Sequence, residues 1–145
     1  MTDPASSHDA DRVVTVEPFD DAGATLVVDG DLDLATASQL ATALHDQIGH
    51  GHRHLVVDLS HATFFDSCAM VALLRGLAPL RDEPAAAVAL INGHPVVRRA
   101  LEVSGIGEMF SSFETRDQAI TAISNDPERL CASWRQVGRG ATPGS

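Results

Sequence analysis

The sequence predicts a single α/β domain built on a mixed, mostly parallel β-sheet. Short apolar runs alternate with stretches of helical periodicity, and strands joined by helices favour parallel pairing with right-handed crossovers. The chain has 145 residues, which is enough for one core but not for two. Apolar residues make up 44% and aromatic residues only 4%, so the core is expected to be mostly aliphatic.

The first half of the chain is expected to form a hairpin, a helix and a central strand. Leu40, Leu44 and Ile48 repeat at the four-residue spacing of one helix face, and Gly49 follows as a helix end. The expected elements are strands at 13–17 and 25–28 around a turn at 20–23, a helix at 35–48, and a buried strand at 55–59 followed by a polar loop.

The second half is expected to form three helices and two strands. Asp66 and Thr115 stand at helix N-cap positions, Pro79 ends a helix, and Pro95 suits a first helical position. The expected elements are a helix from Ser67 to about Ala78, a polar loop at 81–84, a strand at 88–91, a helix from Pro95, an edge strand at 110–113, and a last helix through Ile120 and Ile123.

The two ends of the chain differ in composition from the middle. Asp126 can cap a further helix with Pro127 at its first position. Leu130, Trp134 and Val137 fall on one face of it, which either packs against the domain or contacts a partner, such as a second copy in a homodimer. The predicted boundaries are 1–12 for a flexible arm, 13–124 for the domain, and 125–145 for an extension that is part helical and part disordered.

Charge and composition argue against several classes of protein. A formal net charge of −10 does not suit a nucleic-acid binder, which needs a basic face for the phosphates. The first eleven residues are acidic and polar, unlike a signal peptide, and no apolar run has membrane-spanning length. Cys68 and Cys131 are the only cysteines, which fits a reducing compartment. We therefore expect a cytoplasmic protein that binds neither nucleic acid nor membrane.

The segment 55–77 carries the clearest functional signal, because its helix opens on an Asp-Ser pair. The Asp66 carboxylate can accept hydrogen bonds from the free N–H groups of the first turn. Ser67 then lies at the positive end of the helix dipole, where a phosphate on its hydroxyl would meet free N–H groups. The residues alone leave two interpretations open, namely simple helix capping and a phosphorylation switch.

This segment resembles the phosphoacceptor segment of STAS domains, the fold of bacterial anti-sigma factor antagonists. Two further segments, 30–37 and 95–105, are similar to the early strand-to-helix junction and the late helix of that family. Cys68 and Ala69 depart from the pattern, because the family usually has Ser or Thr and then Gly there. The matching residues are Asp58, Leu59 and Ser60 for D-L-S, and Phe65, Asp66 and Ser67 for the aromatic residue, the aspartate and the phosphoacceptor.

The resemblance implies a partner-switching regulator. Such a protein binds an anti-sigma factor, a histidine-kinase-like ATPase with serine kinase activity, while Ser67 is unphosphorylated, and releases it on phosphorylation. A serine phosphatase would then be a further partner. The alternative is a STAS regulatory subunit of a transport assembly, such as an ABC lipid or anion transporter. No G-x-S-x-G elbow, Walker loop or nucleophile–base set is evident, so we expect no enzyme, no cofactor and no bound metal.

The site is expected at the carboxyl ends of the parallel strands, where loops gather. The aspartates of the loop after the second strand should form an acidic rim around the Ser67 hydroxyl, with Asn92 and Gly93 beside it. A phosphate there should block a partner without unfolding the domain. The residues expected to bind the partner are Asp31, Asp33, Asp66, Ser67, Cys68, Ala69 and Met70.

Two other groups of residues have competing interpretations. His50, His52 and His54 alternate on one side of an extended segment, and a solvated loop is favoured over a metal site, which needs converging ligands. Cys68 is interpreted as a small buried residue, and the alternative is a redox sensor that pairs with Cys131.

Overall fold

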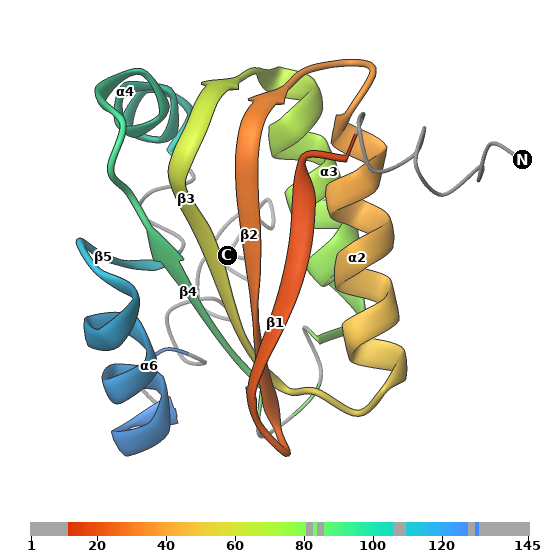
Figure 1. The fold of residues 1–145 in the computed structure, drawn as a ribbon, viewed down its shortest axis with the longest axis vertical. Coiled ribbons are helices and arrows are strands. Elements are labelled where there is room, and N and C mark those ends of the chain that lie inside the picture. Colours follow the sequence, from red (N-terminus) through yellow and green to blue (C-terminus); the bar gives the residue numbers. More distant parts are fainter. Residues whose placement is uncertain (1–11, 81–82, 84–85, 106–109, 128–129, 131–145) are drawn as a thin grey trace, which may run out of the picture.

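The computed structural model of the chain describes residues 12–80, 83, 86–105, 110–127 and 130. Five strands form one sheet in the order β1-β2-β3-β4-β5 (Figure 1). The first pair is antiparallel and every later pair is parallel, which confirms the mixed, mostly parallel sheet. The strands are β1 (Val14–Asp20), β2 (Gly23–Leu32), β3 (His54–Phe65), β4 (Ala87–Ile91) and β5 (Ser111–Phe113).

Four helices of two turns or more pack on this sheet within the described part of the chain, as the sequence predicts. The Asp66, His94 and Thr115 side chains each accept a backbone N–H at the start of a helix. Helices α2 and α3 cover one face of the sheet, and α6 lies against the other (Figure 1). The helices are α2 (Ala37–Gly49), α3 (Ser67–Leu77), α4 (Pro95–Ser104) and α6 (Arg116–Asn125), with a short 3-10 helix, η1 (Ala78–Leu80), after α3.

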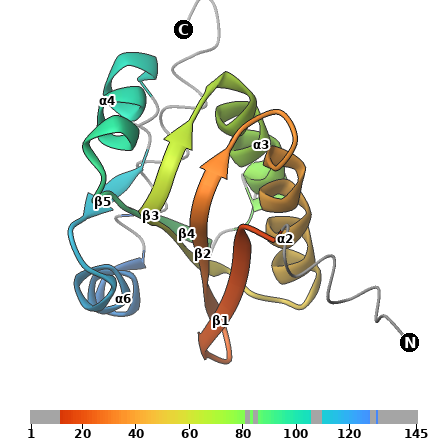
Figure 2. The same cartoon turned by 45° about the horizontal axis from the view of Figure 1, so that its top comes forward.

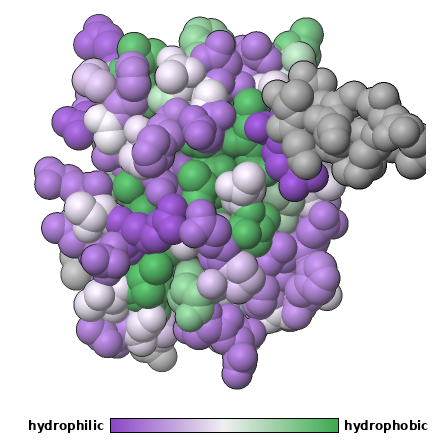
Figure 3. All heavy atoms as spheres, viewed as in Figure 1, coloured by the Kyte–Doolittle hydropathy of each residue, from purple (hydrophilic) through white to green (hydrophobic). Residues whose placement is uncertain are grey.

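The core is aliphatic and divided between the two faces. The α2–α3 face holds the larger cluster, which includes Leu26, Leu44 and Leu73. The α6 face holds a smaller cluster in which Ala89 of β4 packs near Ile123 of α6. Figure 3 shows one side of the molecule, where hydrophobic residues gather at the centre with hydrophilic residues around them. The strands supply an apolar side chain to each face in turn, as parallel strands covered on both sides do.

The start of the predicted C-terminal helix adds to the smaller cluster. Pro127 and Leu130 are helical, and Leu130 is buried with only 3% of its surface exposed. This contact favours packing against the domain for the first turn of the extension. Trp134, Val137 and the cysteine at 131 lie outside the described residues, as do residues 1–11 of the arm predicted at 1–12.

Strand β3 is longer than the sequence predicts, because the expected polar loop after Leu59 is strand as far as Phe65. The extra length pairs with the end of β2, up to the rung between Leu32 and Phe65. Two register shifts in this stretch accommodate Gly30, whose φ of +128° suits glycine. The sequence predicts a loop here because the segment contains polar residues, and two of these, His61 and Thr63, are exposed in the strand.

Helices α2 and α3 approach each other closely at Gly76. A Cβ added at Gly76 would lie 2.9 Å from the Leu44 Cβ and 2.6 Å from its Cδ1. Helix propensity favours alanine over glycine by about 1 kcal/mol, whereas overpacking a core costs about 1–3 kcal/mol. We therefore expect Gly76→Ala to lower the free energy of unfolding, measured by urea denaturation.

Gly49 supplies the matched control, because a Cβ there would meet nothing within 4 Å. Gly49→Ala should leave the free energy of unfolding unchanged or slightly higher. Equal tolerance of the two substitutions would contradict the close packing of α2 on α3.

Candidate functional site

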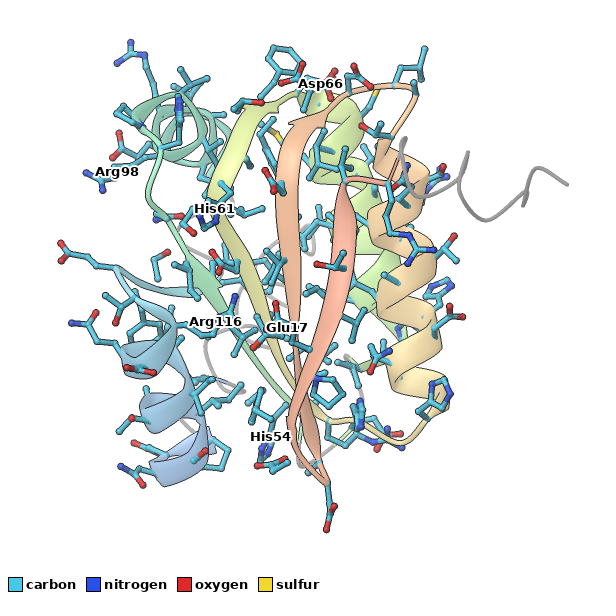
Figure 4. The ribbon with its side chains drawn as sticks, viewed as in Figure 1. Glu17, His54, His61, Asp66, Arg98 and Arg116 are labelled. Carbon is cyan, nitrogen blue, oxygen red and sulfur yellow. The ribbon has the colours of Figure 1, made fainter. Side chains whose placement is uncertain are left out.

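Ser67 is the first residue of α3 and its side chain is exposed. Asp66 caps the helix, with its Oδ1 accepting the Ala69 N–H at 3.1 Å and its backbone carbonyl accepting the Met70 N–H at 3.1 Å. Asp66 stands at the edge of the molecule where β2 and β3 end (Figure 4). The hydroxyl therefore sits at an open helix N-terminus, where partial positive charge favours an anion.

The loop between β2 and α2 is held by its own side chains. Asp33 Oδ1 accepts the N–H groups of Ala35 at 2.9 Å and Thr36 at 3.2 Å. The Thr36 hydroxyl donates to the backbone carbonyl of Asp31 at 2.6 Å. These bonds fix the loop around Leu34, whose side chain projects into solvent with 81% of its surface exposed.

This loop and the start of α3 are brought together by the last rungs of the β2–β3 ladder. Asp31 is in register with Phe64, and Leu32 with Phe65. The Thr63 hydroxyl also donates a hydrogen bond to the Asp31 carboxylate. Figure 2 shows that β2 and β3 end at one edge, where the chain passes into α2 and α3. Residues distant in sequence thus border the same surface.

The surface beside Ser67 also includes a largely apolar groove, which the sequence did not predict, next to the aspartates of the expected acidic rim. The carboxylates of Asp31, Asp33 and Asp66 all accept hydrogen bonds, so they hold their loops in place. Between α2 and α3 lies an open groove of about 410 Å³, with Val71 47% exposed at its rim. Its lining residues are Leu34, Ala37, Ser38, Ala41, Ser67, Cys68, Val71, Ala72 and Arg75.

The residues expected to bind a partner therefore occupy different positions. Ser67 and Cys68 line the groove, and Met70 is half-buried against the core. Ala69 has no exposed surface, so it packs beneath the site and offers no side chain to a partner in this structure. Cys68 is a free thiol that is only half-buried, which corrects the expectation that it is buried.

Sequence reasoning missed the apolar part of the surface. Leu34 is an apolar residue within a polar loop, which is a signal that the sequence does contain. Val71 and Arg75 follow Ser67 at four-residue intervals on one helix, so helical spacing alone would have placed all three on one face. Their position opposite α2 depends on the tertiary fold.

The loop at Asn92 and Gly93 does not lie beside Ser67, contrary to expectation. Strand β4 ends opposite Asp58, and a Cβ on Gly93 would lie 3.0 Å from the Ser60 Cα. Strand β3 continues beyond Ser60 to Phe65, which at about 3.3 Å per residue is about 16 Å. The strands end at different heights, so this loop meets the middle of β3.

Asp58 has a structural role on the α6 face. Its side chain is 4% exposed and accepts the Ser60 N–H at 2.9 Å, the Ser60 hydroxyl at 2.6 Å and an Arg116 N–H at 3.3 Å. Arg116 also donates to Glu17 at 2.9 Å (Figure 4). Burial opposes the charge of Arg116, but hydrogen bonds and Coulombic attraction from the two carboxylates outweigh it and raise the arginine pKa. This ion-pair network ties α6 to β1 and β3.

The histidine segment has local hydrogen bonds. His50 Nδ1 lies 2.6 Å from the Asp46 carbonyl oxygen, and His52 Nδ1 lies 2.6 Å from the Gln47 Oε1. Within the described part of the chain, no group of three or more His, Cys, Asp or Glu residues is placed to hold a metal ion. Nor does any helix in that part have the length and apolar character needed to cross a membrane.

Comparison with known proteins assigns the family. The family model described as the STAS domain matches residues 14–119, so this chain belongs to the STAS domain family. Its homologues include anti-sigma factor antagonists. The anti-sigma-F factor antagonist RsfB of Mycobacterium tuberculosis is 29% identical over 113 residues, which cover 76% of this chain and 89% of RsfB.

Solved structures of antagonists share the fold. An anti-sigma factor antagonist from Mycobacterium paratuberculosis superposes with a TM-score of 0.69 at 27% identity, covering 77% of this chain and 93% of the other. The antagonist SpoIIAA of Bacillus, in its unphosphorylated form, gives a TM-score of 0.67 at 20% identity, covering 77% and 96%. The predicted STAS fold is thereby confirmed.

Removal of the Asp66 cap should destabilise the start of α3. Because the carboxylate accepts the Ala69 N–H, we expect Asp66→Ala to lower the free energy of unfolding by about 1 kcal/mol. Asp66→Asn should keep most of the stability of wild type, because an amide oxygen can accept the same hydrogen bond. Asp29→Ala, at an exposed aspartate of β2, is the control and should have little effect. Equal effects of Asp66→Ala and Asp29→Ala in urea denaturation would argue against a stabilising cap.

Proposed function

We propose that this chain is an anti-sigma factor antagonist that regulates sigma-factor-dependent transcription by partner switching. It binds an anti-sigma factor, a histidine-kinase-like ATPase, while Ser67 is unphosphorylated, and phosphorylation of Ser67 by that kinase releases it. A serine phosphatase restores the binding form. The observation that carries the proposal is the exposed Ser67 hydroxyl at the rim of an apolar groove.

The geometry gives a physical reason for release. A phosphate adds about −1.5 to −2 charges at neutral pH. The open N-terminus of α3 can accommodate it, although the Asp66 carboxylate already accepts one of the first-turn N–H groups. A partner that covers Leu34 and Val71 would have to desolvate this dianion together with the apolar side chains. Binding is lost while the fold is retained.

The relatives support this assignment. RsfB is an antagonist of an anti-sigma-F factor, and the fold shared with SpoIIAA occurs in a protein known in both unphosphorylated and phosphorylated forms. The Asp-Ser pair of the family motif is retained here as Asp66 and Ser67.

The first test uses purified histidine-kinase-like anti-sigma factors from the source organism. Wild type and Ser67→Ala should bind one of them, whereas Ser67→Glu should bind more than about tenfold more weakly, or about 1.4 kcal/mol. The melting temperature of Ser67→Glu should match wild type. Ser124→Glu, an exposed serine of α6 on the opposite face, is the matched control and should bind normally.

Mass spectrometry after incubation with the bound kinase and ATP should place phosphate on Ser67 alone, and Ser67→Ala should take up none. Phosphate on a different residue, or tight binding by Ser67→Glu, would refute the proposed switch.

A second test concerns the departure from the family pattern at Cys68 and Ala69. Ala69 stiffens the first turn relative to glycine by up to about 1 kcal/mol, and Cys68 removes a second hydroxyl beside Ser67. We expect the double variant Cys68→Ser, Ala69→Gly to bind more members of a kinase panel without a change of fold. If every kinase binds both proteins equally, these two positions have no effect on partner choice.

A further inference from the structure

The groove between α2 and α3 extends well beyond Ser67. Ser67, Val71 and Arg75 follow one another at four-residue spacing on α3 and all line it. At a rise of about 1.5 Å per residue, the groove wall runs about 12 Å from Ser67 to Arg75. A partner held only at the phosphoacceptor would leave most of this wall uncovered.

The groove has apolar side chains at its Ser67 end. Leu34 and Val71 are 81% and 47% exposed, and they are among only five large hydrophobic residues with exposed side chains in the described part of the chain. Exposed apolar residues grouped along a groove are typical of a docking surface. These two belong to different elements, yet both border the same groove.

The far end of the groove carries a cation, the guanidinium of Arg75. Arg75 is exposed, and in the described residues its guanidinium makes no ion pair, whereas Arg53 pairs with Glu83 and Arg116 with Glu17. The whole chain carries a formal charge of −10, with twenty acidic residues against ten arginines and no lysine. A free guanidinium beside an apolar groove matches the planar, bidentate geometry of a carboxylate.

We propose that this groove receives an apolar segment of the anti-sigma factor, and that Arg75 pairs with a carboxylate on that segment. The inference rests on the proposed function, and it adds the chemistry of the partner. The apolar side chains of the segment cover Leu34 and Val71, while its acidic residue lies about 12 Å from the Ser67 contact, or two turns of a helix. Arg75 thereby selects among anti-sigma factors by charge.

The test compares Arg75→Glu with Arg98→Glu, because both replace an exposed arginine by glutamate. Arg75→Glu should weaken binding of the anti-sigma factor that wild type binds by about tenfold or more, and Arg75→Gln by less. Arg98→Glu, at an exposed arginine of α4 that also lacks an ion pair among the described residues, should bind like wild type. Arg75→Gln and Arg98→Glu should keep the melting temperature of wild type, whereas Arg75→Glu puts a negative charge in the last turn of α3 and should lower it slightly.

Kinetics separate docking from chemistry. With the same kinase, Arg75→Glu should raise the KM for phosphorylation of Ser67 and leave kcat unchanged, because Arg75 lies two helical turns from the hydroxyl. An acidic-to-arginine substitution on the partner that restores binding to Arg75→Glu would identify the paired carboxylate.

Three results would overturn the inference. If Arg75→Glu binds like wild type while Ser67→Glu does not, the contact at Arg75 is absent but the proposed function stands. If wild type binds no anti-sigma factor, both fail. If sedimentation shows a wild-type dimer that Leu34→Asp dissociates, the groove is occupied by a second copy of this chain.

Discussion

The parallel pairing of β2 with β3 along their full length is the constraint on which the site depends. The last rung joins Leu32 to Phe65; from there β2 leads through a short loop into α2, and β3 leads through Asp66 alone into α3. A shorter ladder would leave the Leu34 loop and the Ser67 turn free to separate. The hydrogen bond from Thr63 to Asp31 closes this end of the ladder. The groove between α2 and α3 exists because both helices start from this shared edge.

The acidic residues of the family motif stabilise the segments in which they lie. Asp33 and Asp66 accept backbone N–H groups in their own loops, and each such bond contributes about 1 kcal/mol net. Asp58 does the same for Ser60 and pairs with Arg116 on the other face. With the carboxylates engaged in this way, Ser67 and its apolar neighbours Leu34 and Val71 remain exposed. In the proposed switch, a phosphate on Ser67 therefore changes the surface without breaking these hydrogen bonds.

Local signals predicted the fold and the position of Ser67 well. Asp66 at the N-cap and Pro95 at a helix start are determined by neighbouring residues, and the helices begin where such residues predict. The length of β3 could not be predicted, because its second half is half-polar and becomes strand only through pairing with β2. The placement of Gly93 was wrong for the same reason, since strand ends in a sheet depend on their partners. The groove was missed because it combines side chains from α2, α3 and the loop at Leu34.

The most direct measurement is a calorimetric titration of one anti-sigma factor with this protein, made before and after the same preparation is phosphorylated enzymatically. Mass spectrometry gives the number of phosphates per chain. We expect the affinity to fall by more than about tenfold, with the melting temperature unchanged. Equal affinity of the two forms would contradict the central claim, and so would a loss of affinity that accompanies unfolding.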